Sequence, residues 1–255
     1  DAEGVIPLSF TRDTPGILAS TIDGVILFDE IITRIKNTEN VSKEAITIGV
    51  PKDFFYDNLS TGVRQISTEV IQKLKDANIN LVTLNINGLP DLLKESISLV
   101  LHETEISLKA YVKKYCAEVS YENLVSQIAS PDVKGLFDSG AIGENPNYEE
   151  AQKERDKLRK LYQDYFQKNK IDAIIYPTTP LEARKIEESD ETVMLNGKQE
   201  PSFATYIRNV NPGSYAGVPS ISIPVAKTDE GLPVGMLLES AEGTDKKLLR
   251  IAALL

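Results

Sequence analysis

Hydrophobic residues along the chain recur with two periods, and these periods predict an order of strands and helices. A β-rich apolar run over residues 46–50 ends at Pro51. From Ser60, a residue type that often caps helices, apolar positions recur every three or four residues to about Asn78 and predict an amphipathic helix. A second strand is expected over residues 79–86. A strand, a helix and a strand at this spacing predict a βαβ unit with parallel strands and a right-handed crossover.

Further helices are predicted before and after this unit. Downstream of the turn DTPG, the residues Ile22, Val25, Ile26 and Ile32 recur at helical spacing, and Asp29 breaks their apolar stripe. The remaining helical patterns lie over residues 89–115, 121–130 and 146–170.

The last third of the chain is predicted to form mainly strands and loops. A continuous apolar run within residues 171–180 predicts a buried strand that stops at Pro177. The polar, Gly- and Pro-punctuated segment 184–201 predicts a surface loop, and residues 220–240 predict a hairpin around an Asp-Glu-Gly turn. Together the elements predict an α/β fold in which helices flank a mixed β-sheet. Because no shift in composition marks a linker, one domain is expected over residues 1–255.

The net charge of the chain disfavours some classes of binding partner. The chain of 255 residues carries 28 Lys and Arg against 38 Asp and Glu, for a formal charge of −10. This sign disfavours direct binding to nucleic acid or to an anionic membrane surface. No apolar run approaches the roughly 18 to 20 residues that cross a bilayer, and no secretory signal pattern opens the chain. We therefore expect a cytoplasmic protein that binds neither nucleic acid nor membrane.

Cysteine and histidine are too scarce for several kinds of site. One Cys excludes an internal disulfide framework, and one Cys with one His leaves too few soft ligands for structural zinc. No metal and no cofactor are expected. The chain starts with Asp1 and stops within the helical pattern KLLRIAALL, so both ends are expected to be cut.

The familiar nucleophile motifs are absent from the sequence. A Ser-His-Asp triad would need His102, which the pattern places in the middle of a long helix. Cys116 lies fourteen positions further along the same helix, about 21 Å away at 1.5 Å per residue. The chain contains no S-x-x-K, no adjacent Ser-Ser, no Gly-Gly and no glycine-rich phosphate loop. No catalytic residue is therefore assigned.

Four segments resemble the amidase signature family in order and approximate spacing: DAEGVIPLSFTRDTPGILASTIDGVILFDEIIT, ITIGVPKDFFYDNL, IDAIIYPTTP and NVNPGSYAGVPSISIPVAKTDEGLPVGMLLESAEGTDKKLL. Within the family, the run from Arg208 to Gly217 is similar to R-N-x-x-P-G-S-x-A-G of the branch that contains indoleacetamide and mandelamide hydrolases. The chain departs from the common family pattern at Ile17 and at Ala19-Ser20.

The resemblance implies an amidase-signature core that lacks its N-terminal part. In this family a Ser, a cis-configured Ser and a Lys cleave the amide, and these residues precede the segment that opens this chain. The implied activity is hydrolysis of a small carboxamide to an acid and ammonia or an amine. The implied partner is the missing N-terminal portion or another chain, so this chain alone is expected to be inactive.

Other functions stay open at this stage. The alternatives are a non-catalytic binding or partner module derived from an amidase, a piece like the A subunit of a glutamine-dependent tRNA amidotransferase, and an α/β fragment without an independent role. The donor-reading Arg and Asp of the amidotransferase branch are not found at the matching positions, which favours simple hydrolysis.

Polar residues near the predicted strand ends are the candidate substrate-binding residues, because α/β sites collect there. Asn side chains could hydrogen-bond an amide or form turns, and the two threonines could line a pocket or cap a turn. The candidates are Thr178, Thr179, Asn209, Asn211 and Ser214.

The small residues around these candidates have two readings as well. Gly213 and Gly217 could form a rigid pocket wall or let a helix end pack on a sheet. Pro219 and Pro224 are expected to mark the entry and exit of a strand. Arg208 could bind a substrate carboxylate or a surface acid.

Overall fold

The structure, a computed structural model, describes residues 3–116, 118–143, 146–188 and 191–255. Asp1, the expected cut end, and residues 189–190 of the polar segment lie outside the described residues. Across the described part of the chain, no helix is both long enough and apolar enough to cross a bilayer.

Internal contacts group the chain into two compact units. Unit 1 comprises residues 1–16 and 91–157, and unit 2 comprises residues 17–90 and 158–255. The expectation of one domain stays a prediction, and the two units are described separately.

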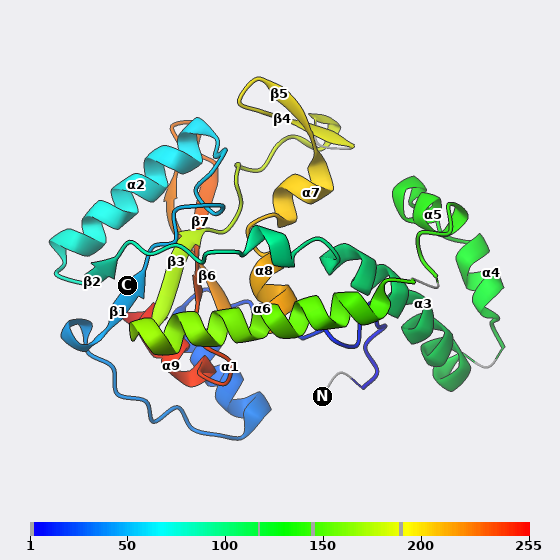
Figure 1. The fold of residues 1–255 in the computed structure, drawn as a ribbon, viewed down its shortest axis with the longest axis horizontal. Helices are drawn as coiled ribbons and strands as arrows, with labels where there is room; N and C mark the ends of the chain where they lie inside the picture. Colours follow the sequence, from blue (N-terminus) through cyan, green and yellow to red (C-terminus); the bar gives the residue numbers. More distant parts are fainter. Residues whose placement is uncertain (1–2, 117, 144–145, 189–190) are drawn as a thin grey trace. The chain divides into compact units, whose positions relative to one another are not determined.

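Unit 2 is built on a five-stranded sheet with the strand order β2-β1-β3-β7-β6 (Figure 1). β1 pairs in parallel with β2 and β3, whereas β7 pairs antiparallel with β3 and β6. This arrangement confirms the predicted α/β fold with a mixed sheet flanked by helices. The strands are β1 (Thr47–Gly49), β2 (Asn80–Val82), β3 (Ala173–Pro177), β6 (Ser220–Lys227) and β7 (Pro233–Glu239).

The predicted parallel strand–helix–strand unit is present as β1, α2 and β2. The helix α2 (Thr61–Asp76) begins after Ser60, whose hydroxyl accepts a hydrogen bond from the Val63 N–H at 3.2 Å. Thr47 pairs with Asn80 in parallel register. Strand β2 lies at the sheet edge and is shorter than the predicted strand over residues 79–86.

The central strand β3 is buried on both faces of the sheet. Ala173 and Ile175 belong to the core that also contains apolar residues of α2 and α9 (Asp245–Leu254). Tyr176 lies on the opposite face, where its ring stacks on Phe55 with centroids 3.9 Å apart. A strand covered on both faces reads as a continuous apolar run, and the buried strand was therefore predicted correctly.

Strands β6 and β7 form the predicted hairpin, but Pro224 does not end the first strand. Strand β6 continues to Lys227, with a register shift between Pro224 and Ala226. Proline lacks an N–H donor and is tolerated on an edge strand at a bulge, so the strand continues past this proline. The turn contains Gly231 with a φ of 84°.

The segment 184–201 is not a loop throughout, which corrects the prediction. It contains a second two-stranded sheet formed by β4 (Thr192–Leu195) and β5 (Lys198–Pro201). Asn196 and Gly197 join the strands with φ values of 49° and 78°, as an Asn-Gly type I′ hairpin turn requires. Val193 and Leu195 alternate inward into a small core with Leu181. The residue between them, Met194, is apolar although it is exposed, so the alternation was not visible in the sequence.

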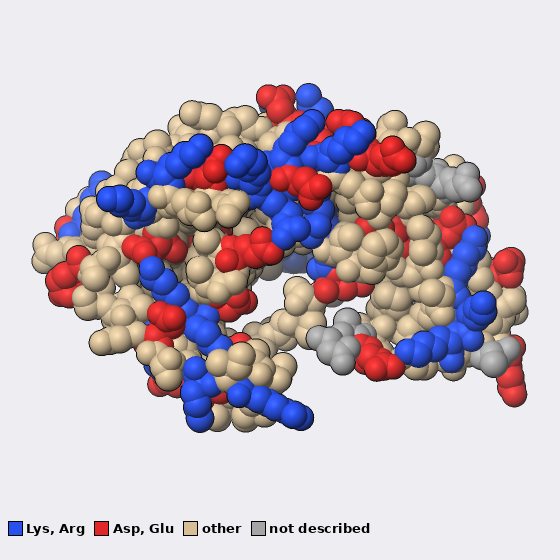
Figure 2. All heavy atoms as spheres, turned by 60° about the horizontal axis from the view of Figure 1, so that its bottom comes forward, with Lys and Arg blue, Asp and Glu red and all other residues tan. Residues whose placement is uncertain are grey.

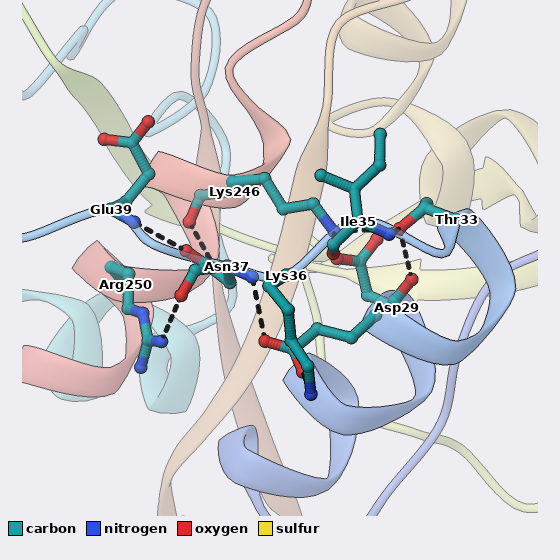
Figure 3. A network of polar contacts seen from close by, with 9 residues as sticks. Asp29, Thr33, Ile35, Lys36, Asn37, Glu39, Lys246 and Arg250 are labelled. Carbon is teal, nitrogen blue, oxygen red and sulfur yellow. Dashed lines mark hydrogen bonds and ion pairs between the residues drawn. The ribbon is translucent and has the colours of Figure 1, made fainter.

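The helix α1 (Ile22–Thr33) was predicted correctly in position but not in the face that it buries. Thr21 caps it by accepting a hydrogen bond from the Gly24 N–H at 3.1 Å. Ile26 is buried as predicted, whereas Ile32 is exposed. Asp29, the residue that breaks the stripe, faces inward and forms an ion pair with Lys246 of α9 (Figure 3).

Unit 1 is helical. The first helix begins at Ser96, several residues later than predicted, because Pro90–Leu92 form a separate 3₁₀ turn. A helix over Pro131–Asp138 was not predicted. The helices are α3 (Ser96–Tyr115), α4 (Tyr121–Ser126), α5 (Pro131–Asp138) and the part of α6 (Tyr148–Asn169) up to Lys157.

A buried carboxylate joins the N-terminal segment of unit 1 to its helices. Glu103 of α3 is fully buried and accepts hydrogen bonds from the hydroxyls of Ser9 at 2.5 Å, Thr11 at 2.8 Å and Tyr148 at 2.9 Å. The Thr11 N–H adds a fourth bond at 3.2 Å. Several hydrogen bonds to the charged form allow a carboxylate to be buried. The sequence PLSFTRD therefore holds a structural contact of this unit.

We expect Glu103→Ala to destabilise unit 1 by about 2–4 kcal/mol, because it leaves the buried hydroxyl of Ser9 and the half-buried hydroxyls of Thr11 and Tyr148 without their acceptor. Glu105→Ala is the matched control, since Glu105 forms an ion pair with Lys109 near the surface and such pairs contribute at most about 1 kcal/mol. Urea unfolding, together with hydrogen exchange over residues 8–13, measures both. Equal losses for the two variants would contradict the structural role of Glu103.

Candidate functional site

The candidate site in unit 2 begins where β3 ends. The Thr178 N–H donates to the Gly235 carbonyl of β7 at 3.0 Å, and the Thr178 hydroxyl lies 2.6 Å from the Ser222 hydroxyl of β6. A Cβ on Gly235 would lie 2.8 Å from Ser222 Oγ and 3.0 Å from Thr178 Oγ1. A glycine at this position therefore leaves room for the two hydroxyl groups, which meet at the solvent-exposed side of the sheet.

Thr179 follows directly but is used differently. Its hydroxyl donates to the Leu181 carbonyl at 2.8 Å, two residues further on. This contact matches the alternative reading of a side chain that stabilises a turn. Its role in substrate binding stays a prediction.

Asn209 is fully buried and connects three parts of unit 2. Its amide nitrogen donates to the carbonyl of Pro177 at 2.7 Å and to that of Phe55 at 3.0 Å. Its amide oxygen accepts from Arg208 Nε at 3.1 Å. Both amide hydrogens and the oxygen are thus engaged, so Asn209 positions the chain around the end of β3.

Arg208 donates its hydrogen bonds to other parts of unit 2, and the reading in which it binds a substrate carboxylate stays a prediction. Besides Asn209, it donates from Nη2 to the backbone carbonyl of Asp57 at 2.6 Å. Partial burial lowers the pKa of its guanidinium from the usual value. The side chain thereby ties the loop before α2 to the segment that follows α7 (Ser202–Ile207).

Asn211 and Ser214 lie on the short helix α8 (Asn211–Ala216). Asn211 is half-buried at the first helical position, and Ser214 is exposed. Gly217 ends the helix in the left-handed region with a φ of 74°, the conformation that favours glycine. Thr178 and Asn209 thus meet around the end of β3, and Asn211 and Ser214 follow on the next helix.

Helix α8 packs closely on the sheet because Gly213 has no side chain. A Cβ at this position would clash with the carboxyl group of Glu239 on β7. This finding matches the alternative reading in which the small residues let a helix end pack on a sheet. It leaves the pocket-wall reading a prediction.

Glu239 is a buried acid at this contact. Burial raises its pKa from 4.5 to about 8, although the nearby hydroxyls of Tyr176 and Tyr162 act in the opposite direction. Among the described residues, Glu239 Oε2 and both tyrosine hydroxyls find no hydrogen-bond partner of good geometry. An isolated buried carboxyl group favours its neutral form. We conclude that Glu239 is protonated over most of the physiological pH range.

Sequence reasoning missed Ser222 as a member of the site. Along β6, Ile221, Ile223 and Val225 pack against the core, and the intervening Ser222 faces the other side of the sheet. This period-two alternation is visible in SISIPV. It would have paired Ser222 with Thr178 only once the order of β3, β7 and β6 was known.

Unit 1 contains the other groups considered for catalysis. His102 lies within α3, where its Nδ1 is 3.0 Å from the Gly143 carbonyl and its ring centroid is 4.2 Å from that of Tyr148. Cys116 directly follows the end of the same helix. Within the ranges that the structure describes, no cluster of His, Cys, Asp and Glu could hold a metal ion.

Charged side chains of both signs are interspersed on the face seen in Figure 2. Helix α6 illustrates the pattern, because Asp164 pairs with Lys160 at 3.5 Å and with Lys168 at 3.2 Å. On this face, positive side chains alternate with negative ones and do not form one continuous basic stripe.

Sequence comparison identifies the family to which the chain belongs. The Amidase family profile matches residues 2–249, and the chain belongs to this family. It is 37% identical over 257 residues to an indoleacetamide hydrolase of Rhizobium radiobacter, covering 98% of this chain and 55% of that protein. It is 34% identical to a mandelamide hydrolase of Pseudomonas putida, covering 98% of this chain and 51% of that protein.

Solved structures show the same fold. A crystal structure described as an amidase superposes with a TM-score of 0.79 at 24% identity, covering 97% of this chain and 53% of the other. A peptide amidase in complex with chymostatin superposes with a TM-score of 0.73 at 19% identity. The chain thus spans about half the length of the relatives that it matches.

Replacing Glu239 by Gln should flatten the pH dependence of stability. Because the folded-state pKa of about 8 lies above the ordinary 4.5, the stability associated with this group is full below pH 4.5. It is lost at up to roughly 1.4 kcal/mol per pH unit as the pH rises toward 8. Glu239→Gln should therefore gain stability relative to wild type between pH 5 and pH 8.

Urea unfolding at several pH values measures this difference. Glu242→Gln provides the control, because Glu242 is exposed and pairs with Arg159. Parallel pH profiles for wild type and Glu239→Gln would show that Glu239 is ionised in the folded protein.

We expect Asn209→Ala to destabilise unit 2 by about 2–4 kcal/mol, because two buried carbonyl groups lose their donor. Ser214→Ala should change stability by less than about 0.5 kcal/mol, since its side chain is exposed. Chemical denaturation compares the two variants. An Asn209→Ala variant as stable as the wild type would contradict the positioning role of Asn209.

Proposed function

We propose that this chain forms the substrate-binding part of an enzyme that hydrolyses a small carboxamide to an acid and ammonia or an amine. The observation that carries the proposal is the match to indoleacetamide and mandelamide hydrolases along 98% of the chain. That match includes every segment that surrounds the end of β3. The substrate would be a small amide with an aryl-bearing acyl group.

The groups that make and break the bond would lie on polypeptide outside these 255 residues. The sequence supports this reading because it contains no S-x-x-K, Ser-Ser or Gly-Gly. The resemblance to the family implies that a lysine removes a proton through a bridging cis-configured serine while a second serine attacks the carbonyl carbon. Backbone N–H groups would stabilise the oxyanion, and water would release the acid.

The residues of unit 2 would hold the substrate against that machinery. One hydroxyl of the Thr178–Ser222 pair donates to the other across 2.6 Å, so the second hydroxyl keeps a proton for a substrate acceptor. Asn211 and Ser214 on α8 would supply further polar contacts. Asn209 would act through position, because its amide group is engaged with Pro177 and Phe55.

An activity test separates this function from a non-catalytic role. The chain is assayed for ammonia release from indole-3-acetamide and mandelamide, first alone and then co-produced with the portion of the Rhizobium radiobacter hydrolase that it does not match. Turnover is expected in the mixture and not with the chain alone. Hydrolysis by the chain alone, lost on substitution of one of its own side chains, would overturn the proposal.

The pocket residues can be tested in the same mixture. Thr178→Val and Ser222→Ala should each raise KM several-fold while kcat changes little, since the hydroxyl pair would bind the substrate without taking part in the chemistry. Lys227→Ala, at the far end of β6, is the control. Unchanged KM in both pocket variants would remove the pair from the binding site.

A further inference from the structure

Helix α1 presents an apolar face to solvent. Leu27, Phe28, Ile31 and Ile32 are between 51% and 63% exposed. At 100° per residue these four side chains fall within one side of the helix. Ile35, just beyond the helix, is exposed as well. We call Leu27, Phe28, Ile31 and Ile32 the outer face of α1.

The opposite side of α1 is fixed to unit 2 by buried and polar contacts. Ile26 is buried, and Lys246 of α9 donates to Asp29, to the Thr33 hydroxyl at 2.9 Å and to the Ile35 carbonyl at 3.0 Å (Figure 3). These bonds converge on one ammonium group. The helix therefore cannot rotate about its axis to bury its outer face without breaking these hydrogen bonds.

The segment after α1 strengthens this attachment. Arg34 ends the helix in the left-handed region with a φ of 58°. Asn37 donates from its amide nitrogen to the Lys246 carbonyl at 2.9 Å, and its backbone N–H donates to Glu30 at 2.8 Å. Arg250 donates to the Asn37 carbonyl at 2.7 Å (Figure 3). The orientation of α1 on unit 2 is thus set at both its polar side and its C-terminal end.

We propose that the outer face of α1 is the docking surface for the remaining portion of an amidase, the portion that would carry the nucleophile. This inference rests on the proposed function. The solved amidase that superposes with a TM-score of 0.79 is almost twice as long as this chain. The superposed part covers 97% of this chain and 53% of that amidase. Completing such a fold requires apolar surface on both portions, and the outer face of α1 offers it.

Other occupants fit the surface less well. A helix of 12 residues is about 18 Å long and about 10 Å wide, so this face alone buries far less than the roughly 800 Å² per partner of a stable dimer. An anionic lipid surface would meet the exposed Asp23 on the same helix and would be repelled by a chain with a formal charge of −10. A completing portion of the same fold adds contacts beyond α1 and has neither problem.

The test uses the 255-residue chain and, as the probe, the portion of the Rhizobium radiobacter indoleacetamide hydrolase that it does not match. The two are co-produced, and the amount of probe that co-purifies with the chain is measured. Phe28→Asp and Ile31→Asp should each reduce it at least tenfold. Phe203→Asp, an exposed aromatic residue on α7, should leave it unchanged. Circular dichroism confirms that each variant is folded.

Several outcomes would overturn the inference. These are no co-purification with the wild-type chain, or co-purification that Phe28→Asp and Ile31→Asp do not reduce. A discrete dimer of the chain alone that Phe28→Asp dissociates would assign the face to a second copy. Flotation with vesicles of phosphatidylcholine and phosphatidylglycerol that the same substitution abolishes would assign it to lipid.

Activity in the same mixture separates this inference from the proposed function. Binding through α1 without hydrolysis of indole-3-acetamide would support the docking surface and contradict the hydrolase. Hydrolysis that survives both α1 substitutions would support the hydrolase and contradict the docking surface.

Discussion

Strand β3 is held on both edges and both faces, and the organisation of unit 2 depends on this enclosure. It pairs in parallel with β1 and antiparallel with β7, so the sheet changes from parallel to antiparallel pairing at its second edge. Apolar residues of α2 and α9 cover one face, and Phe55 covers Tyr176 on the other. Because the strand is fixed in this way, the Pro177 carbonyl at its end offers a fixed acceptor to Asn209. The segment that leads into α8 is positioned from that bond.

Local sequence patterns predicted much of the fold. Ser60 marked the start of α2, and the uninterrupted run of β3 indicated a strand buried on both faces. The β6–β7 hairpin followed from its turn. The errors arose where long-range contacts decide the outcome. Asp29 looked like an interruption of a stripe, yet it faces inward because Lys246, more than 200 residues away, supplies its partner. No local pattern reveals such a partner.

The candidate site was predictable in location and less so in the role of each residue. Thr178 and Asn209 do meet at the end of β3, as the position of strand ends suggested. However, Asn209 is occupied by two backbone carbonyls, and Ser222 joins Thr178 only because β7 lies between their strands and contributes a glycine. Glu239 could not be assigned a role from sequence, since its neutrality depends on burial beneath Gly213 and beside two tyrosines. These properties are created by packing.

The order of the chain places a constraint on folding as well. Residues 91–157 of unit 1 separate the first two strands of the sheet from β3, so the Thr47 N–H meets its acceptor Asp172 across 125 positions. Pairings at such separation require closure of a long loop and form slowly. During synthesis, β1 can pair with β3 only after residues 91–157 of unit 1 have emerged from the ribosome. The intervening segment therefore sets the earliest moment at which this sheet can assemble.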